Sequence, residues 1–223
     1  MKLHFGMAMW LFGILGIGLA DLAGAAETGS IQDLKSPEEI LKFRETYIRD
    51  FKRIGLNTAP GDAMMLRILV QAARCRRGIE VGTATGYGAI VMGVAFERTG
   101  GELTSIDIDP RMVKIAQEHI RNMGLEKTVK VVEGDALKVL PALEGEYDFI
   151  FIDAQKQDYL KYFKAVETKL KTGAVIVADN VIQSKNAMKD FLDYFNNNPH
   201  YDALTVICSE EKSDGMMVIY KVK

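Results

Sequence analysis

Short apolar runs alternate with longer amphipathic stretches along the chain from residue 78 onward. Apolar runs that alternate with helical patterns predict parallel strands, with helices covering both faces of the sheet. The predicted strands of this region cover residues 78–81, 103–106, 129–132, 147–152 and 174–178. The predicted helices cover residues 87–98 and 110–123, a short segment before Pro141, and a segment that ends near residue 170.

Two further helices are expected before this region. The sequence Ser36-Pro37-Glu38-Glu39 is typical of a helix start, because the serine can cap the first turn and Glu39 can reach back to the cap. We expect this helix to run to about residue 54, with Gly55 as its stop. A second helix is expected over residues 62–73.

The C-terminal part predicts one more helix and two strands. The helix covers residues 185–196, and the strands cover residues 204–208 and 216–222 with a short polar loop between them. A short loop between two strands is typical of an antiparallel pair. The chain is therefore predicted to form an α/β fold, a doubly wound and mostly parallel seven-stranded sheet with an antiparallel C-terminal edge strand.

The N-terminus has a different pattern. Lys2 precedes an apolar run over residues 5–20, and Ala23-Gly24-Ala25 follows it. This order is typical of a secretory signal, and extension of the apolar run makes it marginal for a membrane anchor. An apolar helix packed on the domain or on a second subunit is the alternative. We expect residues 1–26 to be a signal peptide or membrane anchor, and residues 31–223 to form the functional domain.

The composition restricts the class of protein. The chain has 223 residues, of which 48% are hydrophobic and 26% charged, as expected for one globular domain. Its formal net charge of −2 gives no indication of a nucleic-acid partner. Cys75 and Cys208 are the only cysteines, which argues against a zinc site or a disulfide framework.

The candidate chemistry lies where the predicted strands end, because ligands of such sheets bind outside the carboxyl ends of the strands. Gly82 and Gly86 have the spacing G-x-x-x-G, which differs from the G-x-G-x-x-G of dinucleotide-binding proteins. Asp107 ends the second strand and can accept both hydroxyls of a ribose. Asp135 and Ala136 follow the third strand, where they can meet an adenine. Each feature alone is compatible with an ordinary turn or cap, but their order on successive strands predicts an adenosine-type ligand.

Oxygen side chains follow the fourth and fifth strands. Asp153 ends one of them, and Asp179 and Asn180 end the other. These strands can be neighbours, so the three side chains can converge. Oxygen ligands without histidine or cysteine suit a hard cation, with Mg²⁺ as the first choice and Mn²⁺ or Ca²⁺ as alternatives. The other interpretation is that the three residues cap a helix and a loop.

A family resemblance covers these motifs. The segments E-V-G-T-A-T-G-Y, I-D-I-D-P, E-G-D-A, F-I-D-A-Q-K and A-D-N, within residues 80–180, resemble the cation-dependent class I S-adenosylmethionine (SAM) O-methyltransferases of the catechol and caffeoyl-CoA type, including their small bacterial members. The resemblance extends more loosely over residues 36–223. It implies that SAM is surrounded by Glu80, Gly82, Ala84, Tyr87, Asp107, Asp135, Ala136 and Asp153. It also implies that the metal ligands are Asp153, Asp179 and Asn180.

The resemblance gives Lys156 the role of general base, which removes the proton of the hydroxyl to be methylated. A lysine can act as a base only where its pKa is lowered, and a neighbouring divalent cation has this effect. Without the matching motif, a solvated surface lysine is the simpler interpretation. The implied reaction transfers a methyl group from SAM to a small catechol-like acceptor, a vicinal diphenol. The resemblance further implies a homodimer.

Some features depart from this pattern or leave alternatives open. Met217 stands where the animal catechol enzymes carry a glutamate that binds the second hydroxyl, and no role is assigned within residues 57–62. The localisation stays open, because residues 5–26 indicate export or membrane contact whereas SAM is made in the cytoplasm. A nicotinamide-dependent oxidoreductase and an exported or tethered nucleoside-binding protein without catalysis are the competing hypotheses.

Overall fold

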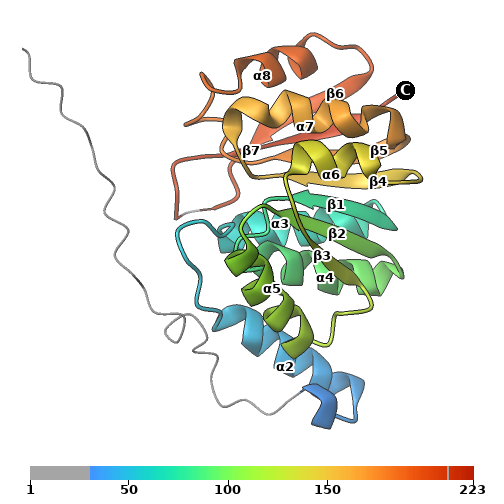
Figure 1. Ribbon diagram of the computed structural model, residues 1–223, viewed down its shortest axis with the longest axis vertical. Helices are drawn as coiled ribbons and strands as arrows, with labels where there is room; N and C mark the ends of the chain where they lie inside the picture. The colour runs from blue at the N-terminus through green and yellow to red at the C-terminus, as the bar shows by residue number, and fades with distance from the viewer. Residues whose placement is uncertain (1–30, 210) are drawn as a thin grey trace, which may run out of the picture.

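The computed structural model describes residues 31–209 and 211–223, which form a sheet covered by helices on both faces (Figure 1). The described strands lie in the order β3-β2-β1-β4-β5-β7-β6. Their bounds are Arg77–Val81 (β1), Glu102–Asp107 (β2), Val129–Glu133 (β3), Tyr147–Ile152 (β4), Leu170–Ala178 (β5), Tyr201–Val206 (β6) and Met216–Lys221 (β7). The first five strands pair in parallel, and β7 is antiparallel to both of its neighbours. The predicted fold class is therefore confirmed.

Two helical layers cover the sheet. The helices are α2 (Pro37–Arg49), α3 (Pro60–Ala72), α4 (Tyr87–Thr99), α5 (Pro110–Asn122), α6 (Ala136–Ala142), α7 (Tyr159–Val166) and α8 (Lys189–Asn196). Short 3₁₀ turns lie at Ile31–Asp33, Lys156–Asp158 and Glu167–Lys169. Buried apolar residues of α3 and α4, together with Ile120 of α5, belong to one apolar core, and those of α6, α7 and α8 belong to the other.

Alternation along the central strands explains the two layers. On β4, Phe149 and Phe151 belong to the core under α3 and α4, whereas Ile150 and Ile152 belong to the core under α7 and α8. Successive side chains of a strand point to opposite faces, so a continuous apolar run buries both of them. Each fully buried side chain of this size stabilises the fold by roughly 1.5–3 kcal/mol.

The N-terminal helix begins as predicted but ends earlier. The Ser36 hydroxyl accepts a hydrogen bond from the Glu39 amide at 3.1 Å, and the Glu39 carboxylate accepts one from the Ser36 amide at 2.9 Å. The helix ends at Arg49 rather than near residue 54, so the predicted stop at Gly55 is wrong. The chain leaves the helix where Phe51 packs between two rings, with its centroid 4.5 Å from that of His119 and 5.2 Å from that of Tyr87.

Other boundaries shift because of contacts that are distant in sequence. Strand β5 begins at Leu170 rather than Ala174, and β6 begins at Tyr201 rather than Leu204. The last helix begins at Lys189 rather than near residue 185. The backbone before it is held in turns, because the amides of Ile182 and Gln183 donate to Asp214.

The antiparallel pair has an order that the sequence pattern did not predict. Strand β7 lies next to β5, with Val177 opposite Val218, and it pairs on its other side with β6. The edge of the sheet on this side is therefore β6, and the later strand β7 is enclosed between two neighbours. The buried face of β7 carries Met217, whose side chain belongs to the core beside α7 and α8.

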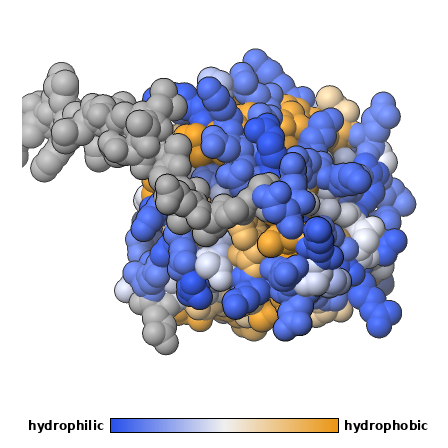
Figure 2. All heavy atoms as spheres, turned by 90° about the horizontal axis from the view of Figure 1, so that it is seen from below, coloured by the Kyte–Doolittle hydropathy of each residue, from blue (hydrophilic) through white to orange (hydrophobic). Residues whose placement is uncertain are grey.

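Polar side chains cover most of the face shown in Figure 2, with apolar ones between them. Large apolar side chains that stay exposed include Leu41 on α2 and Met64 and Ile68 on α3. Among the described residues, no helix is both long enough and apolar enough to cross a membrane. The predicted signal peptide or anchor at residues 1–26 lies outside the described residues, so it stays a prediction.

Candidate functional site

The loop after β1 packs directly on the end of β4. Gly82 has a φ of +97°, and a Cβ atom added there would lie 2.0 Å from the carbonyl oxygen of Asp153. Only glycine combines this backbone conformation with so close an approach. The glycine-rich loop and the acidic residue after β4 are therefore parts of one site.

Asp107, at the end of β2, fixes the conformation of this loop. One carboxylate oxygen accepts hydrogen bonds from the amides of Thr83 and Ala84, at 3.0 and 2.8 Å. The other oxygen accepts from the Asp109 amide at 2.9 Å. A carboxylate has about four lone-pair sites, so Asp107 can still accept hydrogen bonds from a ligand. The predicted ribose acceptor therefore has a fixed position beside the loop.

Glu80 lies beneath the loop and is buried. Burial raises the pKa of its carboxyl to about 8, against the hydrogen bond donated by the Ser105 hydroxyl and with the nearby charges of Asp153 and Asp107 adding to the rise. A Cβ atom at Gly88 would lie 2.6 Å from a carboxyl oxygen of Glu80, so α4 packs closely on this group. Glu80 is therefore a neutral acid at pH 7 in this environment.

The other predicted SAM contacts also lie where the parallel strands end. Asp135 caps α6, because its carboxylate accepts a hydrogen bond from the Leu137 amide at 2.9 Å. Ala136 begins α6 and is half-buried against the core. The ring of Tyr87 is buried beside Phe51, with the Arg53 guanidinium 5.7 Å from its centroid.

Asp153 and Asp179 follow neighbouring strands, as predicted, and a chain of hydrogen bonds connects them. Lys156 Nζ donates to Asp153 Oδ1 and to the Tyr159 hydroxyl, both at 2.8 Å. The Tyr159 hydroxyl in turn donates to the backbone carbonyl oxygen of Asp179 at 3.2 Å. Burial raises the pKa of Tyr159 well above its usual value, and the charges of Asp153 and Asp179 add to this effect, so the hydroxyl remains a donor.

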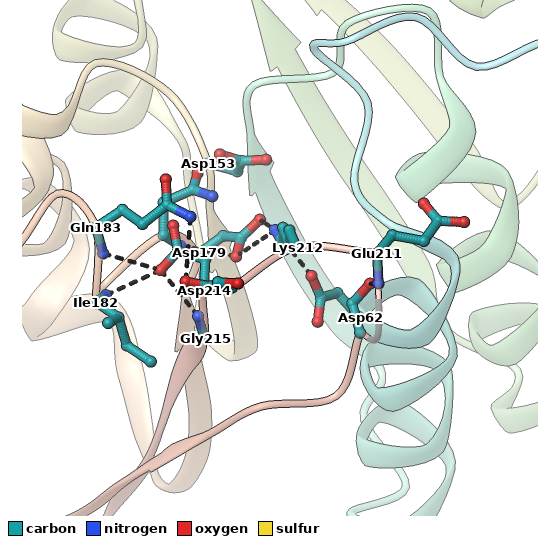
Figure 3. Close-up of polar contacts among 12 residues, drawn as sticks. Asp62, Asp153, Asp179, Ile182, Gln183, Glu211, Lys212, Asp214 and Gly215 are labelled. Atoms are coloured by element: carbon teal, nitrogen blue, oxygen red, sulfur yellow. Dashed lines mark hydrogen bonds and ion pairs between the residues drawn. The ribbon is translucent and has the colours of Figure 1, made fainter.

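Asp62 and Lys212, which have no predicted role, lie beside Asp153 and Asp179 (Figure 3). We call the carboxylates of Asp62, Asp153 and Asp179 the acidic cluster. Lys212, from the loop between β6 and β7, donates to both carboxylate oxygens of Asp179 at 3.0 and 2.7 Å. Its Nζ also lies 2.8 Å from Asp62 Oδ2, at the start of α3. The side chains of Asp62 and Asp179 are 0% and 1% exposed. The ammonium group therefore lies between two fully buried carboxylates.

The environment of these groups shifts their protonation. Burial raises the pKa of Asp179, the charge of Asp153 raises it further, and the hydrogen bonds from Lys212 oppose both effects. Burial lowers the pKa of Lys212, but its hydrogen bonds to Asp179 and its ion pair with Asp62 outweigh burial and give a net rise. Lys212 is therefore a stable ammonium ion in this position.

Asn180 adopts a left-handed conformation with a φ of +61°, and its backbone N–H donates to the Asp179 carboxylate at 2.7 Å. Asparagine tolerates this conformation better than most residues. Next to it, Asp214 accepts hydrogen bonds from the amides of Ile182, Gln183 and Gly215 (Figure 3). Burial raises the pKa of Asp214, but these amides outweigh burial and lower it overall.

The oxygen donors of the cluster are of the type that a hard cation prefers. Asp153, Asp179 and Asn180 offer oxygen donors, and Asp62 adds a buried carboxylate whose oxygens accept no hydrogen bond from the described residues. Among residues 31–209 and 211–223, no three histidine, cysteine, aspartate or glutamate side chains are grouped as metal ligands. Buried carboxylates require compensating positive charge, and Lys212 provides it in this arrangement.

Sequence reasoning had missed Asp62 and Lys212. A signal for Asp62 exists, because Asp62, Leu66 and Val70 repeat every four residues and lie on the buried face of α3. An acid on an apolar helix face predicts a buried charge that needs a partner. Lys212 carries no such signal, because it belongs to a polar loop with no periodic pattern.

Comparison with known proteins finds a family model and several relatives that are similar to this chain. A family model described as O-methyltransferase matches residues 32–217. The catechol O-methyltransferase of Niastella koreensis is 33% identical over 139 residues, which cover 60% of this chain and 62% of that protein. A caffeoyl-CoA O-methyltransferase of Populus trichocarpa is 25% identical over 209 residues, with coverage of 85% and 84%. The match to the first of these relatives thus spans about three fifths of its length.

Solved structures show the same fold. The O-methyltransferase from Bacillus cereus in complex with SAH has a TM-score of 0.69 and 24% identity, and covers 86% of this chain and 94% of its own. TomG from Streptomyces achromogenes in complex with SAM has a TM-score of 0.71 and 23% identity, with the same coverage. The family match favours the methyltransferase prediction over the nicotinamide-dependent alternative.

Proposed function

The chain belongs to the O-methyltransferase family, and from this premise we propose that it transfers the methyl group of SAM to a hydroxyl of a small catechol-like acceptor. The observation that carries the proposal is the close packing of Gly82 on the carbonyl of Asp153. This contact joins the glycine-rich loop to the residues that follow β4, so a methyl donor on the loop is adjacent to Lys156 and the acidic cluster.

The proposed SAM site is formed by Glu80, Gly82, Ala84, Tyr87, Asp107, Asp135, Ala136 and Asp153. Asp107 supports this proposal, because the amides of Thr83 and Ala84 hold one of its oxygens in place and the Asp109 amide holds the other. When bound, SAM supplies an electrophilic methyl group. The chain supplies orientation, and a well-positioned pair of reactants can account for about 7–11 kcal/mol of the barrier at best.

Lys156 is the proposed general base. Its Nζ lies between Asp153 and the Tyr159 hydroxyl, so the amine is held in one place at the end of β4. To accept a proton from the acceptor hydroxyl, Lys156 must first be neutral. A divalent cation, with Mg²⁺ as the first choice, would be held by Asp153, Asp179 and Asn180 and would lower the pKa of a coordinated hydroxyl.

A methyl-transfer assay with labelled SAM and a panel of vicinal diphenols, with and without chelator, tests the proposal. Lys156→Ala should reduce turnover by about 10²–10⁴-fold, the usual contribution of general-base catalysis. SAM affinity measured by calorimetry should be unchanged. Lys161→Ala is the matched control, because Lys161 is an exposed lysine of the same segment that pairs only with Asp158 among the described residues.

Two results would contradict the proposal in different ways. Unchanged turnover in Lys156→Ala would mean that another group accepts the proton. Absence of SAM binding by the wild-type protein would remove the methyl-transfer function itself. Homodimerisation and membrane contact through residues 5–26 are further proposals, which sedimentation of the purified protein and fractionation of cells can test.

A further inference from the structure

Lys212 lies where the acidic side chains converge, at 2.7 Å from Asp179 Oδ2 and 2.8 Å from Asp62 Oδ2. We propose that Lys212 is a tethered cation that occupies the acidic cluster in the absence of metal and must leave when a divalent ion binds. This inference rests on the proposed function, because it concerns the same candidate metal ligands. It adds a residue of this chain that sets how strongly the cluster binds a metal.

The charges of the cluster indicate competition. Three carboxylates, those of Asp62, Asp153 and Asp179, face two ammonium groups. Lys156 pairs with Asp153, and Lys212 pairs with the other two acids. A divalent cation bound to Asp179 would lie beside the Lys212 ammonium, and neighbouring like charges repel strongly in a buried environment. The metal and the ammonium group are therefore alternative occupants.

Burial explains why the cluster needs one of the two cations. Asp62 is 0% exposed, and neither of its oxygens accepts a hydrogen bond from the residues that the structure describes. A buried carboxylate without compensating charge is strongly destabilising. Lys212 provides that charge without any bound ligand. A divalent ion must therefore displace an existing ion pair rather than enter a vacant set of ligands.

The loop that carries Lys212 allows the ammonium group to move. Its end toward β7 is fixed by Asp214, which accepts from three backbone amides. The preceding residue, Glu211, pairs with Arg53 at the surface, with a shortest distance of 2.8 Å. Exposed ion pairs of this kind contribute little to stability. The Lys212 side chain is itself 23% exposed, and a flexible four-carbon stem lets it swing to solvent while Asp214 stays in place.

Calorimetric titration of the full chain with Mn²⁺ tests the inference directly. If Lys212 occupies the cluster for about nine tenths of the time, the apparent Kd for metal is about tenfold weaker than the intrinsic one. Lys212→Met should therefore bind Mn²⁺ about tenfold or more tightly than the wild-type protein. Lys189→Met is the matched control, because it removes the same charge from an exposed lysine that pairs with Asp193 on α8.

The control should bind Mn²⁺ as the wild-type protein does. Equal or weaker binding by Lys212→Met would overturn the inference, as would undetectable Mn²⁺ binding by every variant. A gain in Lys189→Met as large as that in Lys212→Met would also overturn it, because it would reveal a general effect of net charge. If Lys212→Met fails to fold, the double variant Asp62→Asn/Lys212→Met removes both members of the buried pair, and the same gain is expected.

The proposed function fails by a different measurement. Titration with SAM and the methyl-transfer assay report on the donor site, whereas the Mn²⁺ titration reports on the occupancy of the acidic cluster. If the wild-type protein binds SAM but has the same Mn²⁺ affinity as Lys212→Met, only the inference is overturned. If Lys212→Met binds Mn²⁺ more tightly than wild type but no variant binds SAM, only the proposed function is overturned.

Discussion

Replacement of Glu80 by glutamine should change how the stability of the protein depends on pH. Glu80 is buried, and burial raises the pKa of its carboxyl from 4.5 to about 8. Between these two values, the folded protein keeps the proton of Glu80 and the unfolded chain releases it. Folding therefore takes up a proton in this window, so the free energy of unfolding decreases as the pH rises. The stabilising contribution of the protonated Glu80 carboxyl is fully present below about pH 4.5, and it is lost by about pH 8.

The size of this change in the free energy of unfolding follows from the difference between the two pKa values of Glu80. At about 1.4 kcal/mol per pH unit, the interval from 4.5 to about 8 corresponds to roughly 5 kcal/mol. Glutamine has nearly the same shape, keeps an acceptor for the Ser105 hydroxyl and carries no titratable proton. Glu80→Gln should therefore be increasingly more stable than the wild-type protein as the pH rises from about 5 to about 8, by several kcal/mol at the upper end.

Urea unfolding across this pH range measures the effect. The quantity of interest is the difference in unfolding free energy between Glu80→Gln and wild type, because other titrating groups contribute equally to both. Glu102→Gln is the control, since Glu102 is an exposed glutamate on the neighbouring strand β2. A difference between Glu80→Gln and wild type that stays constant with pH would refute the reasoning.

Two further substitutions test the site. Gly82→Ala should lower the free energy of unfolding by about 2 kcal/mol or more and weaken SAM binding, because the added Cβ atom would meet the Asp153 carbonyl at 2.0 Å. Gly55→Ala has no atom within 4 Å of its added Cβ and should match wild type in both urea unfolding and SAM calorimetry; equal values for both variants would count against the loop geometry. Tyr159→Phe removes the hydroxyl that Lys156 contacts, so methyl transfer should fall about tenfold, the effect of about 1.4 kcal/mol, with SAM affinity retained. An unaltered rate would mean that Tyr159 does not position Lys156.

The sheet was predictable because its signals are local. Apolar runs such as residues 147–152 alternate with helical patterns, and a buried parallel strand needs nothing else to be recognised. The position of Asp153 and Asp179 at neighbouring strand ends was also predictable, because they follow consecutive parallel strands that lie side by side. These features follow from periodicity and from the usual connections of α/β folds.

The parts that sequence reasoning missed depend on contacts between distant segments. Helix α2 ends at Arg49 because Phe51 packs against Tyr87 and His119, which no local pattern indicates. Lys212 reaches Asp62 across about 150 residues of chain, from a loop whose path only the folded structure defines. Asp153 and Asp179 are thus visible in the sequence, whereas Lys212, the cation that pairs with Asp179, is not.

The position of β7 has a consequence for how the protein is synthesised. Strand β6 leaves the ribosome before β7, yet only β7 connects it to the rest of the sheet. Until β7 emerges, β6 has no partner strand and β5 presents an unpaired edge, which is the kind of surface that recruits other chains. A nascent chain that stalls before residue 216 should therefore be especially prone to aggregation and dependent on chaperones.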